Sequence, residues 1–190
     1  MATLRTFIAV DSAPHIRSRA ADLVSRLSLA PDKVRWIEPQ NLHWTLKFLG
    51  DVDDVAIAEV CRRVQEAVRS LEPFTIEVCG AGAFPRPDRP RTLWLGVRQG
   101  QEQMTALQAP IEHALAEMGF HQETRRFVPH LTIGRVTRTS SDGQELGELL
   151  AKNADFPAGT MEVDEVVVYS SRLTRDGPEY EPLGRGPLEG

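Results

Sequence analysis

The sequence predicts an α+β fold in which strands from distant parts of the chain come together. Short runs of β-branched and aromatic residues occur along its whole length, and segments with the apolar spacing of amphipathic helices separate some of them. Hydrophobic residues make up 41% of the 190 residues and charged residues 26%, which is the balance of an ordinary globular protein. We expect a single domain over residues 1–190.

The first half of the chain alternates strand-like and helix-like segments. The opening run LRTFIAV is apolar and rich in β-formers, which indicates a buried strand. Pro14 suits the first turn of the following helix, because the N–H that proline lacks has no helical partner there. Gly50 and Asp51 end a later strand, and Asp53 or Asp54 can cap the second helix. We expect strands at 4–10, 34–37 and 42–49 and helices at 14–29 and 54–70.

The second half is predicted to hold the remaining strands and two more helices. Gly119 follows the third helix at its C′ position, and Pro110 in its middle should kink it or split it. Pro129 belongs at the start or the edge of a strand, and Ser141 or Asp142 can cap the fourth helix. We expect strands at 74–78, 92–97, 127–136 and 161–171, a loop rich in glycine and proline at 80–91, helices at 101–118 and 142–152, and a closing hairpin at 174–188.

A short repeat carries the chemistry of this sequence. The first copy, WIEPQNLHWTLKFLG, contains His43 and Thr45, and the second, FVPHLTIGRV, contains His130 and Thr132. Side chains alternate between the two faces of a strand, so each histidine shares a face with its threonine while the residues beside them face the core. The alternative is that both pairs are hydrogen-bonded polar residues within a sheet. The aromatic residue and the proline that precede both copies favour a shared function.

Two histidines at one centre suit acid–base chemistry on a phosphate ester. Imidazole titrates near neutral pH, so one ring can accept a proton while the other donates one. A threonine hydroxyl can donate a hydrogen bond to a phosphoryl oxygen, and an arginine adds a bidentate contact. No serine or cysteine lies in a nucleophile motif, which favours direct attack by water or by a substrate hydroxyl. His43 and His130 are therefore the predicted catalytic pair, and the residues alone leave open which is the acid.

The sequence predicts no metal site, no cofactor and no membrane span. It has two cysteines, Cys61 and Cys79, and no HExxH, HxH or CxxC spacing that would hold zinc. A P-loop and a complete dinucleotide fingerprint are also missing, so we expect no nucleotide cofactor. Neither a signal peptide nor a run of about 18 apolar residues is present, which predicts a cytoplasmic protein that does not span a membrane.

The charge balance limits the class of partner. A net charge of −5 argues against a long duplex, because the chain as a whole repels a polyanion. Arginines are nevertheless dense at 86–91, 125–126 and 135–138, which leaves room for a basic cleft on an acidic body. A short oligonucleotide or a nucleotide held by one terminal phosphate fits this balance better. We expect the protein to act on it as a monomer.

The two motifs resemble the HxTx signatures of the 2H phosphoesterase superfamily, and the details are similar to its LigT-like branch, the RNA 2′,3′-cyclic phosphodiesterases. HWTLKFLGDV is similar to the first motif of that branch and HLTIGR to the second. LRTFIAVD is similar to its first strand and VVVYSSRLTRDGPEYEPL to its closing strands. The resemblance spans nearly the whole chain. It implies a bilobal α+β fold with internal pseudo-duplication, in which two antiparallel sheets face each other across a central cleft with the helices outside.

The resemblance also implies an activity and roles for individual residues. The reaction would be metal-independent hydrolysis of a terminal 2′,3′-cyclic phosphate on RNA to a 2′-phosphomonoester, with reversible 2′–5′ RNA ligase activity in the other direction. His43 would be the general acid and His130 the general base that activates water. Thr45 and Thr132 would hold phosphoryl oxygens, with Arg135 as a further phosphate contact. Arg135 has an odd spacing from His130, so only a bulge or the end of the strand would bring it to the same face.

Two other functions are open on sequence grounds. The same cleft could bind RNA ends without catalysis, or the enzyme could act on another cyclic phosphate or on a 2′–5′ linked substrate. The residue that stacks on the base is also open, because each aromatic candidate suits the core as well as a binding surface. The candidates are Phe7, Trp36, Phe84, Trp94, Phe127 and Tyr169.

Overall fold

The structure is a computed structural model that describes residues 2–138, 144–175 and 177–190, and it has the α+β architecture that the sequence predicted. The helices of the described residues are α1 (Pro14–Leu27), α2 (Ile57–Val68), α3 (Gln101–Glu117) and α4 (Gln144–Lys152), with short 3-10 turns η1 (Pro39–Asn41) and η2 (Asp54–Ala56). The strands are β1 (Thr3–Asp11), β2 (Lys33–Trp36), β3 (His43–Asp53), β4 (Phe74–Arg86), β5 (Arg89–Gln99), β6 (His130–Arg138), β7 (Pro157–Val163), β8 (Glu165–Thr174) and β9 (Gly177–Pro187).

All strand pairs of the described chain are antiparallel, and they form two halves. One half has the order β7-β4-β5-β6, with β2 also paired to β6, and the other has the order β3-β1-β8-β9. The halves meet where β3 pairs with β6, through the single residue pair Trp44 and Leu131. The resemblance implied two antiparallel sheets. In the described residues these two sheets are the halves of one continuous nine-stranded sheet.

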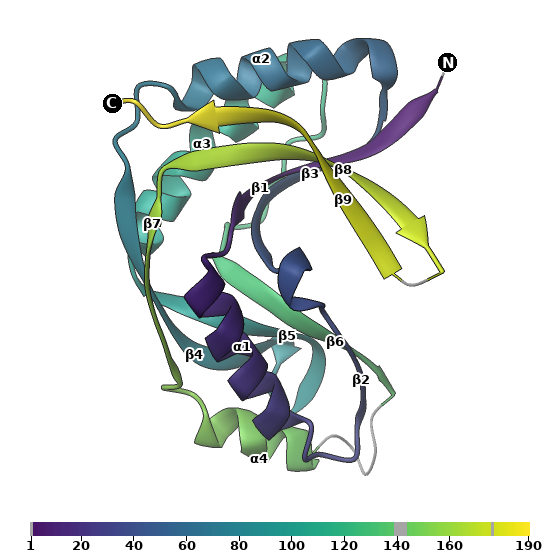
Figure 1. Ribbon diagram of the computed structural model, residues 1–190, viewed down its shortest axis with the longest axis vertical. Helices are drawn as coiled ribbons and strands as arrows, with labels where there is room; N and C mark the ends of the chain where they lie inside the picture. Colours follow the sequence, from purple (N-terminus) through teal and green to yellow (C-terminus); the bar gives the residue numbers. More distant parts are fainter. Residues whose placement is uncertain (1, 139–143, 176) are drawn as a thin grey trace.

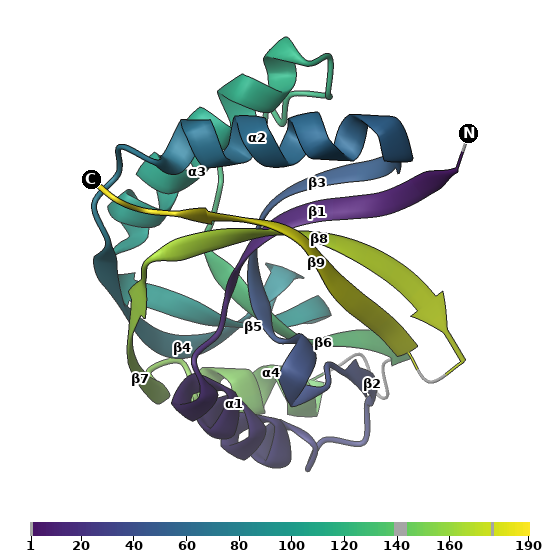
Figure 2. The same cartoon turned by 45° about the horizontal axis from the view of Figure 1, so that its top comes forward.

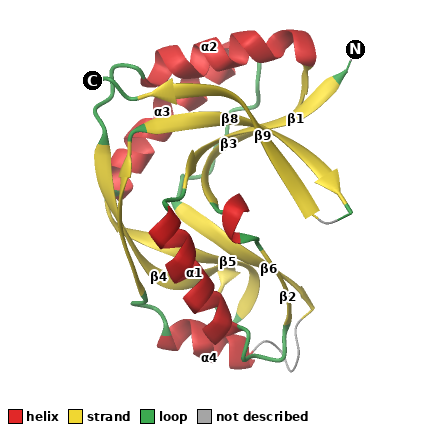
Figure 3. Cartoon of the chain, viewed as in Figure 1, coloured by secondary structure: helices red, strands yellow, loops and turns green. Residues whose placement is uncertain are grey.

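The helices lie on the outside of both halves (Figure 1, Figure 3). α2 and α3 lie side by side over the half that contains β3, β1, β8 and β9, and the turned view shows the same arrangement (Figure 2). α1 packs against β7, and α4 against β4. On α2 the residues Val60, Val64 and Val68 are buried, as expected for apolar side chains at a helical spacing of four. None of the helices among the described residues is long and apolar enough to cross a membrane.

Most of the predicted elements are confirmed, within a few residues at their ends. The helix expected at 14–29 is α1, and the one expected at 54–70 is η2 followed by α2. Gly119 follows α3 with a φ of +89°, as its predicted C′ position requires. Pro129 immediately precedes β6. The hairpin expected within 174–188 is wrong in its extent, because that stretch supplies β9 and only the last residue of β8, the preceding strand with which β9 pairs. The predicted caps Ser141 and Asp142 lie outside the described residues.

The prediction of a loop at 80–91 is wrong, because these residues extend β4 and β5 into a long hairpin. Register shifts between Val78 and Ala81 and between Phe84 and Pro85 accommodate the residues that suggested a loop. Gly82 has a packing role instead: a Cβ there would lie 2.2 Å from Cη2 of Trp94, so only glycine admits that ring.

Three other boundaries differ from the prediction. β3 continues past Gly50, which takes a φ of +74°, to Asp53. α3 is not split at Pro110: it runs from Gln101 to Glu117, and residues of its apolar face are buried on both sides of the proline, including Met104 and Ile111. The run expected as one strand at 161–171 is divided at Asp164 into β7 and β8, which belong to different halves of the sheet.

Candidate active site

The two motif strands cross at the junction of the halves. Trp44 and Leu131 pair across that junction, and both side chains are fully buried. The residues on either side of them point to the opposite face, and all four motif side chains are half-buried. An antiparallel register extended by one position sets His43 opposite Thr132 and Thr45 opposite His130. We call this face of the junction the cleft face; it carries the four motif side chains.

Both imidazoles are held in the same way. Nδ1 of His43 lies 2.7 Å from the carbonyl oxygen of Asn41, and Nδ1 of His130 lies 2.7 Å from that of Val128. A carbonyl oxygen only accepts, so Nδ1 carries the hydrogen in each ring. No hydrogen bond occupies either Nε2 among the described residues. Each Nε2 is therefore available to take or give a proton.

Aromatic side chains form the walls around the two histidines. The ring of Phe7 lies 4.8 Å from that of His43 and 5.4 Å from that of Tyr169, between centroids. Phe84 lies 4.9 Å from His130 and 5.3 Å from Trp94. Four of the six predicted stacking candidates thus contribute to the walls of this site.

The other two stacking candidates, Trp36 and Phe127, have no ring contact with either histidine among the described residues. Trp36 packs over Gly134, where an added Cβ would lie 2.7 Å from its Cε3 atom. Phe127 is half-buried and has no ring contact within the described chain.

A bulge in β6 brings Arg135 to the cleft face, which resolves its odd spacing. Gly134 and Thr132 pair with the adjacent residues Leu93 and Trp94 of β5, so Ile133 is an extra residue. Ile133 and Gly134 are both buried, and Arg135 beyond them is exposed again. Its Nη1 donates to Oγ1 of Thr92 at 3.4 Å.

The first motif has a matching bulge. Thr45 and Lys47 pair with the adjacent residues Ala9 and Ile8 of β1, so Leu46 is the extra residue. Leu46 and Lys47 are both buried, and Phe48, five residues after His43, is 64% exposed. Phe48 thus occupies in β3 the place that Arg135 occupies in β6. The two motif strands have the same local geometry, with a cation at this position on one side and an aromatic ring on the other.

Burial is the main influence on both histidines, and their charged neighbours differ. Burial lowers the pKa of His43 and that of His130 below the usual value, and the backbone hydrogen bond to each ring opposes this. The carboxylate of Asp11 acts to raise the pKa of His43. The guanidinium of Arg135 acts to lower the pKa of His130. The charged neighbours alone therefore favour the protonated form of His43 and the neutral form of His130.

Asp11 belongs to a small cavity beside His43. It pairs with His43 across β1 and β3, and its Oδ1 accepts a hydrogen bond from the Tyr169 hydroxyl at 2.7 Å. The cavity has a volume of about 290 Å³, and its lining includes Asn41 and Tyr180. The Tyr180 ring meets that of His43 edge to face, with centroids 5.3 Å apart.

Sequence reasoning missed four residues of this site. Asp11 pairs with His43, and the Tyr180 ring contacts that of His43. Phe48 pairs with Phe7 across β1 and β3, and Arg35 pairs with Arg135 across β2 and β6. Phe48 could have been found by aligning the two motifs on their histidines, which sets it level with Arg135. The others depend on which strands pair, and no local pattern reports this. Within the described ranges, no group of three or more His, Cys, Asp or Glu side chains is placed to hold a metal ion.

Comparisons with known proteins agree with this geometry. The family model of the 2′-5′ RNA ligase superfamily matches residues 7–175. The chain is 38% identical over 180 residues to a Methanothermobacter thermautotrophicus protein named RNA 2′,3′-cyclic phosphodiesterase, covering 95% of this chain and 96% of that one. A Thermotoga maritima protein of the same name is 35% identical over 98% of this chain and 97% of its own.

Solved structures show the same fold. Escherichia coli LigT in complex with 3′-AMP matches with a TM-score of 0.78 and 27% identity, covering 99% of each chain. A Thermus thermophilus structure matches with a TM-score of 0.82 at 21% identity, over 98% of this chain and 99% of that one. The resemblance seen in the two HxTx motifs is confirmed over the whole length, and the chain belongs to the 2′-5′ RNA ligase superfamily.

Proposed function

We propose that this protein is an RNA 2′,3′-cyclic phosphodiesterase that opens the terminal cyclic phosphate to a 2′-phosphomonoester without a metal ion. The observation that carries the proposal is the pair of imidazoles on the cleft face, each with Nδ1 anchored to a backbone carbonyl and Nε2 available. Two such groups supply a base and an acid to one phosphorus atom. The relatives that carry this name match over nearly the whole chain, which supports the same substrate class here.

The proposed reaction is a direct displacement by water. Nε2 of His130 takes a proton from water, and the water oxygen forms a bond to phosphorus. The bond from phosphorus to O3′ breaks, and O3′ receives a proton from Nε2 of His43. Solvent then returns both rings to their starting states. The charges support this assignment, because Asp11 favours the protonated form of His43 and Arg135 favours the neutral form of His130.

Thr45, Thr132 and Arg135 are the proposed phosphate contacts. The two hydroxyls lie on the cleft face with the histidines, where they can donate to the non-bridging oxygens of the phosphate. The bulge at Ile133 turns the Arg135 guanidinium to the same face, so its positive charge can offset the charge that develops in the transition state.

A product assay under chelation tests the proposal. Purified protein in excess EDTA is given an oligonucleotide ending in a 2′,3′-cyclic phosphate, and the product is identified by ³¹P NMR. We expect complete conversion to the 2′-phosphomonoester at a rate that EDTA does not change. A 3′-phosphomonoester, or loss of activity on chelation that added metal restores, would contradict the mechanism.

The same assay separates the alternatives. Saturable binding of the cyclic-phosphate end without turnover would identify a binding module. Turnover of a 2′–5′ linked dinucleotide or of another cyclic phosphate, with none of the RNA end, would keep the enzyme class and change the substrate. The ligase direction follows from the reversibility of the same steps, and it stays a prediction.

We further propose that residues 1–190 act as one bilobal domain with internal pseudo-duplication, as a monomer in the cytoplasm. The pseudo-duplication is supported by the matching features of the two motif strands. In each motif strand, Nδ1 of the histidine donates a hydrogen bond to the carbonyl oxygen two residues before it. Each strand also has a bulge whose extra residue directly follows the threonine.

A further inference from the structure

A row of side chains extends the cleft face beyond the histidines. Arg5 of β1 pairs with Ser171 of β8, and Ser171 pairs with Tyr180 of β9, so the three side chains project from the same face. Two residues further along β1 in the direction of the site, Phe7 contacts both His43 and Tyr180, with ring centroids 4.8 Å and 5.0 Å apart. The row therefore adjoins the wall of the candidate active site.

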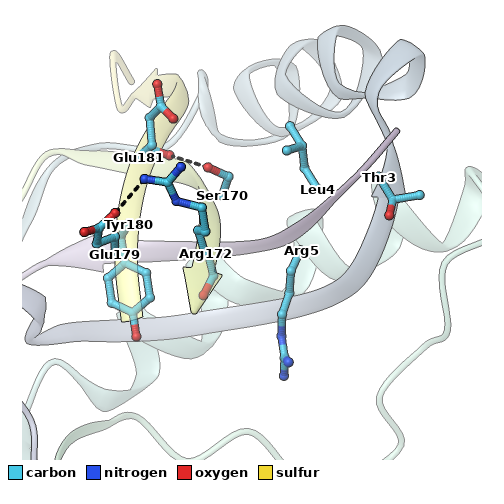
Figure 4. A pocket seen from close by; sticks show the side chains of 9 residues that line it. Thr3, Leu4, Arg5, Ser170, Arg172, Glu179, Tyr180 and Glu181 are labelled. Carbon is cyan, nitrogen blue, oxygen red and sulfur yellow. Dashed lines mark hydrogen bonds and ion pairs between the residues drawn. The ribbon is translucent and has the colours of Figure 1, made fainter. Parts of the chain in front are cut away.

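The acidic residues of this region lie on the other face. Glu179 and Glu181 flank Tyr180 on β9, so strand alternation turns both away from it. Glu179 accepts a hydrogen bond from Arg172 at 2.8 Å, which engages both charges. Figure 4 shows the Arg5 and Tyr180 side chains extending to the lower side of the sheet in that view, while the Glu181 carboxylate lies on the upper side.

Arg5 is an exposed cation with room beside it. It makes no ion pair with any described residue, and Asp51, its pairing neighbour on β3, is not within ion-pair distance. Together with Ser171 and Tyr180 it lines a cavity of about 630 Å³, where β1 and the β8–β9 hairpin diverge. Arg172, Glu179 and Glu181 line the same cavity from the other face, and the Arg172–Glu179 ion pair offsets one of the two carboxylates there. Arg5 and Arg135 both act to lower the pKa of the Tyr180 hydroxyl, so both guanidinium groups lie near it.

We propose that this cavity binds the internucleotide phosphodiester on the 5′ side of the terminal nucleoside, with Arg5 as its cationic contact and the Ser171 hydroxyl as a second donor. The inference rests on the proposed function, because it follows the RNA chain outward from the cyclic phosphate. Phe7, whose ring contacts that of His43, lies two residues or about 6.7 Å from Arg5 along β1, so a terminal nucleoside bound against Phe7 would bring its 5′ phosphodiester within reach of the Arg5 side chain. The site would make the enzyme prefer oligonucleotides to mononucleotides.

The test compares substrates that differ in one charge. Two dinucleotides end in the same 2′,3′-cyclic phosphate, and their internucleotide linkage is either a phosphodiester or an uncharged methylphosphonate. We expect kcat/KM of the wild-type protein to be about 5- to 20-fold higher for the phosphodiester, the effect of one exposed charge-assisted contact. In Arg5→Gln this ratio should fall close to one. The matched control is Arg69→Gln, which removes an exposed arginine that follows α2 and pairs with Glu189 outside this cavity, and it should keep the wild-type ratio.

Salt provides a second readout. Each phosphate neutralised on a single strand contributes about 0.7 to the slope of log affinity against log salt concentration. The slope for the phosphodiester substrate should therefore be shallower by about this amount in Arg5→Gln. A wild-type protein that does not discriminate between the two linkages, or an Arg5→Gln variant that keeps the wild-type ratio, would overturn the inference. Failure of wild-type protein to open either cyclic phosphate would instead overturn the proposed function.

Discussion

At the residue scale, one hydrogen bond fixes the chemistry of each imidazole. The carbonyls of Asn41 and Val128 hold Nδ1–H of His43 and His130, so the same nitrogen of each ring, Nε2, is available for proton transfer. The faces of these residues could be predicted from the sequence, because strand alternation alone places histidine and threonine together. The charged neighbours that shift the two pKa values in opposite directions could not be predicted. Asp11 reaches His43 through strand pairing, and Arg135 reaches His130 through a bulge.

The charged neighbours predict opposite changes in the pH profile of kcat/KM. Asp11→Asn removes a negative charge that raises the pKa of His43, so this pKa falls. The His43 ring then loses, at a lower pH than in the wild-type protein, the proton that it must donate. We expect the alkaline limb of the profile to move to lower pH. Arg135→Gln removes a charge that lowers the pKa of His130, so this pKa rises and the base is protonated at higher pH.

For Arg135→Gln we therefore expect the acidic limb to move to higher pH, together with a lower maximum because a phosphate contact is lost. The measurement is kcat/KM between about pH 5 and pH 9, at constant ionic strength, for both variants and the wild-type protein. Limbs that stay in place in both variants, or that move in the same direction, would contradict the assignment of acid and base.

At the scale of elements, the two bulges and one buried ion pair position the motif strands. Nζ of Lys47, next to the bulge in β3, lies 2.6 Å from Oε1 of Glu112 on α3 and donates to the carbonyl oxygen of His121 at 2.8 Å. The same Oε1 of Glu112 accepts the backbone N–H of Glu123 at 2.8 Å. The pair thus connects the first motif strand with α3 and with the segment that leads to the second motif.

Removing one member of this pair should destabilise the protein strongly. The Lys47 and Glu112 side chains are only 4% and 9% exposed, so either substitution leaves a buried charge without its partner. We expect Lys47→Met to lower the free energy of unfolding by about 3 kcal/mol in urea denaturation. The double variant Lys47→Met, Glu112→Met should lose less than the sum of the single variants. Arg62→Met, at an exposed ion pair on α2, is the control and should have a much smaller effect; an equal loss would mean that burial of the pair is unimportant.

Elements with a strong local signal could be predicted, and those that depend on distant pairing could not. The apolar spacing of α1 and α2 gave their positions within a few residues. The hairpin of β4 and β5 was hidden by glycines and prolines, because Gly82 is there to admit the Trp94 ring. No glycine or proline marks the division of β7 from β8 at Asp164, and the two strands are separated by the crossing of the chain from one half of the sheet to the other.

At the scale of the whole molecule, the site exists because the chain returns to one junction from two distant places. The motif strands lie 87 positions apart in the sequence, from His43 to His130, and they meet only at the pair Trp44 and Leu131. Behind this junction lies a fully buried apolar layer, and in front of it lies the cleft face. The bilobal fold came from the family resemblance, because composition and periodicity alone do not specify how two sheets join.

The most direct test of the account is a double-mutant cycle on the two histidines, measured as kcat/KM for a 2′,3′-cyclic phosphate end. We expect His43→Ala and His130→Ala each to lower kcat/KM by about 10²- to 10⁴-fold, with the double variant little worse than either single one, because acid and base act as a unit. His113→Ala, at an exposed position on α3, should keep wild-type kinetics. Wild-type turnover in either active-site variant, or losses that multiply in the double variant, would contradict the paired mechanism.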